Sequence, residues 1–249
     1  MNSWVGLLKK EFRLTRTLTI AGLAIIAVAF IIAYFMTLRW ELYPIILGMT
    51  ALTVMGHVAY LAIYMFVSLQ AESNKLHLWL HNPQPSLRLL GAKLVNGAAA
   101  NFVSLAVSIA LLMFSLNFVS EGIETHLPFN IGVVFQEVLI FAGFLFLTSI
   151  YISLWLIAAW TVYQFCKAYI GKWSFIIVLI GFLAISTLQG MFENTAIFET
   201  LTNWGYISVT SLNSHFFEGI HVGDILYYLV ISVALFGFSC FLLDRKVEV

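Results

Sequence analysis

The chain has 249 residues, of which 61% are hydrophobic and 10% are charged, and its mean hydropathy is +0.97. Soluble domains are typically about a quarter charged, so this composition excludes a soluble globular protein and indicates one that crosses a membrane several times. Twelve basic and twelve acidic residues leave no net charge, which argues against nucleic acid as a partner.

Residues 1–16 are too polar to cross a membrane, but their pattern is that of an amphipathic helix. On a helical wheel one arc is apolar and the adjoining arc is basic. The apolar arc holds Trp4, Val5, Leu8 and Phe12, and the basic arc holds Lys9, Arg13 and Arg16. We therefore predict an interface helix on the cytoplasmic surface, acting either as a membrane anchor or as a contact for a cytoplasmic partner.

Six hydrophobic stretches are long enough to cross the hydrocarbon, which takes about 20 mostly apolar residues. They cover residues 17–36, 43–69, 89–118, 131–160, 174–191 and 223–243. If the N-terminus is cytoplasmic, eleven of the twelve Lys and Arg residues lie on that side and only Arg39 lies outside. We expect an all-α polytopic protein with one membrane domain over 1–249 and both termini in the cytoplasm. The small residues at 97–100 should let helices approach closely.

The segment 70–88 joins the second and third predicted spans in the cytoplasm. A short helix there would carry an apolar face flanked by histidines, formed by Leu76, His77, Trp79, Leu80 and His81. Such a face predicts docking onto another molecule, with contact to lipid headgroups as the alternative. The two histidines have the spacing of a metal pair, but no Cys, Asp or Glu completes a site, so we predict no metal.

Two ionisable residues stand out inside the predicted spans, His57 in the second and Glu137 near the outer end of the fourth. Ionisable groups within a membrane are functional candidates by default, so both are candidates for lining a translocation path. The alternatives are a neutral, hydrogen-bonded imidazole and a carboxylate that reaches the headgroups.

The outer segment 192–222 contains aromatic and acidic residues but no Lys, Arg or Pro. This mixture is typical of the membrane interface and predicts re-entrant or surface-lying helices. His215, Glu218, His221 and Asp224 recur at three-residue steps, but such steps drift around a helix and are weak evidence for a metal site.

Motifs for nucleotide binding and for catalysis are absent from the sequence. The one Gly-Lys pair, Gly171-Lys172, has Cys166 where a phosphate loop needs its first glycine. There is no His-Glu-x-x-His motif and no nucleophile elbow. We therefore expect a protein that is not an enzyme and that holds no catalytic residues and no cofactor.

The amphipathic entry WVGLLKKEFRLTRT, the loop LHLWLHNPQPSLRLLGAKL and the semi-apolar outer segment together resemble the permease subunits of ABC-2 type exporters. The resemblance implies that the apolar face of 70–88 seats in a separate ATPase subunit, which binds ATP and Mg. The interface-helix residues that would flank this ATPase are Trp4, Lys9, Lys10, Phe12 and Arg13. It also implies a second permease chain, identical or related.

The small size of the chain is similar to that of bacterial plasma-membrane permeases that export, or give immunity to, amphipathic peptides, bacteriocins or toxins. The competing interpretation is an ATP-independent channel, a secondary transporter, or a membrane scaffold or sensor subunit. Secondary transporters more often carry several charges at mid-membrane or broken helices, and here such charges are sparse.

Overall fold

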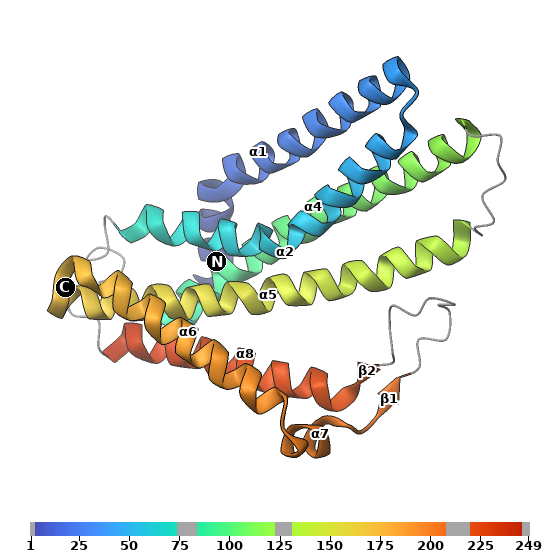
Figure 1. Cartoon of the computed structure of the whole chain (residues 1–249). Coiled ribbons are helices and arrows are strands. Elements are labelled where there is room, and N and C mark those ends of the chain that lie inside the picture. Colours follow the sequence, from blue (N-terminus) through green and yellow to red (C-terminus); the bar gives the residue numbers. More distant parts are fainter. Residues whose placement is uncertain (1–2, 74–83, 123–130, 208–219, 246–249) are drawn as a thin grey trace. The chain divides into compact units, whose positions relative to one another are not determined.

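The computed structural model describes residues 3–73, 84–122, 131–207 and 220–245. Within these ranges the elements are helical, apart from two short paired strands (Figure 1). In chain order the elements are α1 (Ser3–Trp40), α2 (Tyr43–Ser73), α4 (Ser86–Gly122), α5 (Ile131–Ile170), the 3-10 turn η1 (Gly171–Trp173), α6 (Ser174–Glu193), α7 (Ala196–Thr202), β1 (Tyr206–Ile207), β2 (Ile220–His221) and α8 (Val222–Arg245).

Five stretches of the described residues are long and apolar enough to cross a membrane. They are Trp4–Trp40, Tyr43–Ser73, Ser86–Ser120, Gly132–Glu193 and Val222–Asp244. This finding confirms the prediction of a helical protein with several membrane-capable segments. The fourth stretch has 62 residues and contains both the fourth and the fifth predicted spans.

Inside that long stretch the helix is interrupted at η1. Gly171 has a φ of 63°, in the left-handed region that glycine adopts without steric penalty, so α5 ends before it and α6 begins after it. The Ser174 hydroxyl donates a hydrogen bond back to the Gly171 carbonyl at the start of α6. In Figure 1 the ribbon turns back at this point.

The chain forms two compact units: unit 1 comprises residues 1–68 and 91–153, and unit 2 comprises 69–90 and 154–249. Among the described residues of unit 1, one apolar cluster is centred on Val54, Leu105 and Leu145. Another packs Ala33, Ile46 and Val119 together with neighbouring aromatic rings.

Gly97 of α4 lies directly against α2 within unit 1. A Cβ at this position would lie 2.7 Å from the Cδ1 atoms of Leu61 and Tyr64, closer than packed carbon atoms come. Both of these side chains are buried, so they have little room to move. The prediction that the small residues at 97–100 permit close helix approach is confirmed at Gly97.

The N-terminal region differs from the prediction of a separate helix over 1–16. α1 runs without interruption from Ser3 to Trp40, and its ribbon bends near the N-terminal end (Figure 1). Thr15 Oγ1 donates to the Glu11 carbonyl at 2.8 Å and Thr19 Oγ1 to the Thr15 carbonyl at 3.4 Å, a type of bond that often bends helices without ending them.

The face of α1 that packs on other helices is distinct from the apolar arc that was predicted to lie at the membrane surface. Leu7, Glu11 and Thr15 are buried, whereas Phe12 is 56% exposed. These three buried residues are four apart, so they lie along one side of the helix. Phe12 of the predicted arc stays exposed, while the neighbouring Glu11 is buried because it has a partner on another helix.

Unit 2 exposes most of its apolar side chains. In α6 the only buried residue is Ser174. Near the other end of α6, the helix α7 and the antiparallel pair of β1 and β2 lie within the predicted interfacial segment, with Tyr206 paired to His221. A Cβ on Gly223 would lie 2.2 Å from the Thr202 carbonyl oxygen, so glycine is required where α7 meets α8.

Candidate functional site

A buried ion pair joins the first and third long helices of unit 1. Lys93 Nζ of α4 lies 2.7 Å from Glu11 Oε2 of α1, and each side chain is 1% exposed. Lys93 Nζ also donates to Ser68 Oγ of α2 at 3.0 Å. Charges removed from water need both an opposite charge and further hydrogen bonds, and the cation has both here.

Further polar contacts surround this pair and attach the start of α1 to its neighbours. Tyr64 OH of α2 donates to Thr15 Oγ1 at 2.5 Å. Asn96 Nδ2 of α4 donates to the Leu8 carbonyl at 3.2 Å and to the Ala92 carbonyl at 2.9 Å. We call Glu11, Thr15, Tyr64, Ser68, Lys93 and Asn96 the N-terminal polar cluster. It fixes the first turns of α1 on α2 and α4.

The outward side of the same helix segment is basic. Lys9, Lys10 and Arg13, which the resemblance places beside an ATPase, are exposed. Of the two aromatic residues in that predicted set, Trp4 is half-buried and Phe12 is exposed. One face of the segment is therefore bound inside the helix bundle, while the other is available to a second molecule.

His57, a predicted path residue, is buried in unit 1 with both ring nitrogens hydrogen-bonded. Nδ1 lies 2.7 Å from the Thr53 carbonyl, which only accepts, so Nδ1 carries a proton. Nε2 lies 2.9 Å from Ser104 Oγ of α4, and the Tyr60 ring stacks on the imidazole at 5.5 Å between centroids. This is the environment of a neutral, satisfied histidine, and its role in translocation stays a prediction.

A serine of α5 extends the buried polar contacts. Ser149 Oγ accepts from Asn101 Nδ2 at 3.2 Å and from the Leu61 backbone N–H at 3.4 Å. Three helices of unit 1 therefore share hydrogen bonds that avoid solvent. In lipid such contacts substitute for water as the partner of each polar group.

Glu137, the other predicted path residue, is half-buried in the second turn of α5. No hydrogen bond or ion pair joins it to His57 in the part of the chain that the structure describes. The structure therefore does not bring the two predicted path residues into one site. Its predicted role also stays a prediction.

The residues predicted to dock on an ATPase lie outside the described residues; they are Leu76, His77, Trp79, Leu80 and His81. Ser86, which follows them in the sequence, is described and begins α4. Within unit 2 its backbone N–H and its hydroxyl both donate to Asp244 Oδ1 of α8, at 3.1 and 2.5 Å. An aspartate at a helix N-terminus satisfies free N–H groups and complements the helix dipole.

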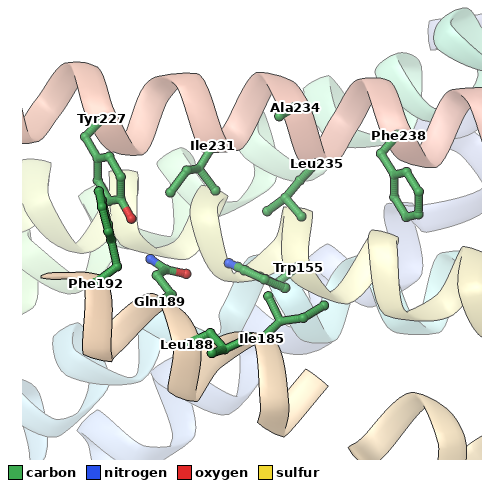
Figure 2. Close-up of a pocket in the computed structure, with 10 residues that line it drawn as sticks. All are labelled: Trp155, Ile185, Leu188, Gln189, Phe192, Tyr227, Ile231, Ala234, Leu235 and Phe238. Carbon is green, nitrogen blue, oxygen red and sulfur yellow. The ribbon is translucent and has the colours of Figure 1, made fainter. Parts of the chain in front are cut away.

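Unit 2 also contains an open apolar groove of about 500 Å³ (Figure 2). It is lined by Trp155, Ile185, Leu188, Gln189, Phe192, Tyr227, Ile231, Ala234, Leu235 and Phe238. Figure 2 shows Ile231 and Leu235 of α8 pointing toward Gln189 and Trp155. At the Phe192 end, Glu193 accepts hydrogen bonds from Gln189 Nε2 at 2.8 Å and from Tyr228 OH at 3.2 Å.

No group of three His, Cys, Asp or Glu side chains suited to a metal ion occurs among the residues that the structure describes. His221 and Asp224, two members of the three-residue repeat, lie close, with Nδ1 3.7 Å from Oδ2. The other two members, His215 and Glu218, fall outside the described part.

Sequence reasoning missed Glu11 and Lys93. Lys93 was counted among the cytoplasmic basic residues that flank a span, although it lies within the apolar run 89–118. The sequence did contain a signal for this ion pair. A lysine lies four residues inside an apolar run, and an acid lies on the amphipathic N-terminal segment. Single-helix patterns do not reveal which acid and which base will meet, so only the structure pairs them.

Comparisons with known proteins assign no family to this chain. No family model matches it, and no solved structure matches it. An uncharacterized protein of Bacillus subtilis (strain 168), YhcE, is 23% identical over 263 aligned positions, which cover the whole of both chains. The chain is thus similar along its entire length to a bacterial protein whose name states no activity.

Proposed function

We propose that this chain is the permease subunit of an ATP-driven exporter of the ABC-2 type. Two such chains, identical or related, form the membrane part in the plasma membrane of a bacterium, and each docks a separate ATPase subunit. The cargo is amphipathic or hydrophobic, with a toxin, bacteriocin or antimicrobial peptide as the favoured class. The ATPase subunit binds ATP and Mg and supplies the energy.

The proposal includes six spans with both termini in the cytoplasm. α5 and α6 have 40 and 20 residues, and at about 1.5 Å per residue each is long enough to cross about 30 Å of hydrocarbon. The break at η1 supports counting them as two spans, with Lys167 and Lys172 on the cytoplasmic side of the turn.

The observation that carries the proposal is the buried pair of Glu11 and Lys93. A helix that served only as a surface anchor would not need a buried ion pair with the bundle. Here the basic, exposed face of α1 is connected through Glu11 to α4, and Lys93 also binds Ser68 of α2. A push on the exposed face is therefore transmitted to two further helices, as a subunit that couples ATPase closure to span movement requires.

On the C-terminal side of the predicted docking residues, the chain is also attached to another helix. Ser86 is held by Asp244, so a displacement of the segment before Ser86 acts on α8 within unit 2. The ATPase changes the helix equilibrium only as far as its closed and open forms differ in affinity for the permease. Because the N-terminal helix is held through Glu11 and the start of α4 through Asp244, that difference in affinity acts on the spans and is not lost in movement of loosely held backbone.

The test is co-purification of the tagged chain with a phosphate-loop ATPase, followed by measurement of ATP turnover in nanodiscs. The double variant Trp79→Asp and Leu80→Asp places charge on the predicted docking face and should abolish both assembly and the permease-dependent part of turnover. Trp173→Asp is the matched control, because Trp173 is 69% exposed in the other predicted cytoplasmic turn. This variant should assemble normally.

Assembly and turnover that are equal in the docking variant and in the control would overturn the proposal. Cargo movement at the full rate by the purified chain, without any ATPase, would favour the ATP-independent channel or carrier instead. Both outcomes can be read in the same nanodisc preparation.

A further inference from the structure

We infer that the groove of unit 2 binds a cationic amphiphile, with its apolar chain in the groove and its positive head at Glu193. This inference rests on the proposed function, because it names the charge and the shape of the cargo. Its test nevertheless needs no ATPase.

The groove itself is suited to an apolar chain. Its volume of about 500 Å³ falls in the range of ligand sites, about 300 to 1,000 Å³. Nine of its ten lining residues are aromatic or aliphatic, and Gln189 is the exception. In Figure 2 these side chains come from α6, α8 and the Trp155 turn of α5, so the groove runs between helices.

The end of the groove at Phe192 has a different chemistry. The Glu193 carboxylate accepts from an amide and a phenol, both neutral, through the same oxygen, Oε1. Residues 174–207 and 220–244, which supply α6, α7 and nearly all of α8, contain no Lys or Arg. The negative charge at this end is therefore not balanced by a basic side chain of those elements.

Two further acids, Glu199 and Asp224, belong to the same outer part of unit 2. Their field attracts cations and repels anions. A half-buried carboxylate next to an apolar surface favours a ligand that brings an ammonium group, because an ammonium gives the carboxylate a charge-assisted hydrogen bond. The apolar groove and the carboxylate together select an amphiphile with a positive head over a neutral or anionic one.

The experiment uses the purified chain in nanodiscs and the fluorescence of Trp155, with the other six of the seven tryptophans replaced by phenylalanine. The probes are a twelve-carbon alkylammonium with a terminal bromine and the alcohol of the same chain length. Bromine quenches tryptophan on contact, so quenching reports occupation of the groove. A protein that retains only Trp173, which is exposed and outside the groove, measures partition into the lipid.

Glu193→Gln should weaken the alkylammonium by about five- to tenfold and leave the alcohol unchanged, since one charge pair is lost and the shape is kept. Glu199→Gln, the matched removal of a nearby exposed acid, should change neither probe by more than about twofold. Ala234→Phe should weaken both probes by filling the groove, whereas Val233→Phe, on a 66% exposed residue outside it, should weaken neither. The thermal unfolding midpoint of every variant establishes that it is folded.

Equal affinity for the two probes, or equal effects of Glu193→Gln and Glu199→Gln, would overturn the inference. Quenching of Trp155 no stronger than that of Trp173 would also overturn it. None of these results alters assembly with an ATPase, so the inference and the proposed function fail by separate measurements. If the single-tryptophan proteins do not fold, competition of the two probes against a photoreactive alkylammonium on the otherwise unaltered chain gives the same comparison.

Discussion

Unit 1 and unit 2 are both rich in apolar residues, but they differ in the side chains that they place between their helices. Unit 1 buries an ion pair and a set of hydrogen-bonded serines, threonines and asparagines between its helices. Unit 2 buries only Ser174 of α6, and its polar contacts between helices include those of Ser86 with Asp244 and of Tyr228 with Glu193.

This difference bears on what each unit does in lipid. Between apolar helices in a bilayer the hydrophobic effect adds little, so close packing and interhelical hydrogen bonds decide which helices associate. Unit 1 has both, although it too exposes apolar side chains. In unit 2, α6 buries only Ser174, and under the proposed function we expect its apolar surface to contact lipid, a second permease chain or cargo.

The largest test of the comparison is Lys93→Met. The variant leaves Glu11 buried without its cation, and we expect unit 1 to lose about 3 to 5 kcal/mol of unfolding free energy. The measurement is unfolding in mixed micelles at increasing denaturing detergent. Lys9→Met, which removes an exposed lysine from the same helix segment, should change the free energy by less than about 0.5 kcal/mol.

The double variant Glu11→Gln and Lys93→Met sharpens this result. Removal of both charges should recover much of the loss, because no buried charge remains unpaired. A double variant as unstable as Lys93→Met alone would mean that the charge pair is not what stabilises the N-terminal polar cluster.

A second, smaller effect is expected for Gly97→Ala. The new methyl group meets buried Leu61 and Tyr64, and overpacking of this kind costs about 1 to 3 kcal/mol. Gly48→Ala is the control, because Gly48 also lies in unit 1 and has no neighbouring atom within 4 Å of the added carbon. That control should be neutral or slightly stabilising, since alanine is the better helix former. Equal destabilisation of the two variants would contradict close packing at Gly97.

The smallest expected change is for Asp244→Ala in unit 2. Loss of both hydrogen bonds to Ser86 removes the cap at the start of α4 and should cost about 0.5 to 2 kcal/mol. Hydrogen exchange at the first turn of α4 should rise, while exchange around Asn101 of unit 1 stays unchanged. Exchange that rises equally at both places would show that the two regions unfold together, which would contradict the contrast between unit 1 and unit 2.

Several features of the fold could be predicted from the sequence because they depend on local pattern. Apolar runs long enough for the hydrocarbon identify the membrane-capable helices, and Ser86 after Pro85 marks the start of α4. The break at η1 follows from a glycine between two runs. The continuity of α1 was missed, although no Pro or Gly lies between Gly6 and Gly22 to interrupt it.

The candidate site was harder to predict from the sequence than the helices were, because the residues in contact are far apart along the chain. His57 and Ser104 are 47 positions apart, and Asn101 and Ser149 are 48. A helical wheel places residues on an arc but does not state which neighbour the arc meets. The wheel therefore placed Phe12 on an outer arc but could not show that Glu11 would be buried against another helix.

The separation of Glu11 and Lys93 by 82 positions has a consequence for synthesis of the chain. A ribosome adds about 5 to 20 residues per second, so α1 waits roughly 4 to 16 s before its cation emerges. Under the proposed topology we expect the carboxylate to stay hydrated at the membrane surface during that interval. We expect α1 to complete its packing only after α4 has been made, which makes this pair a late step in biogenesis.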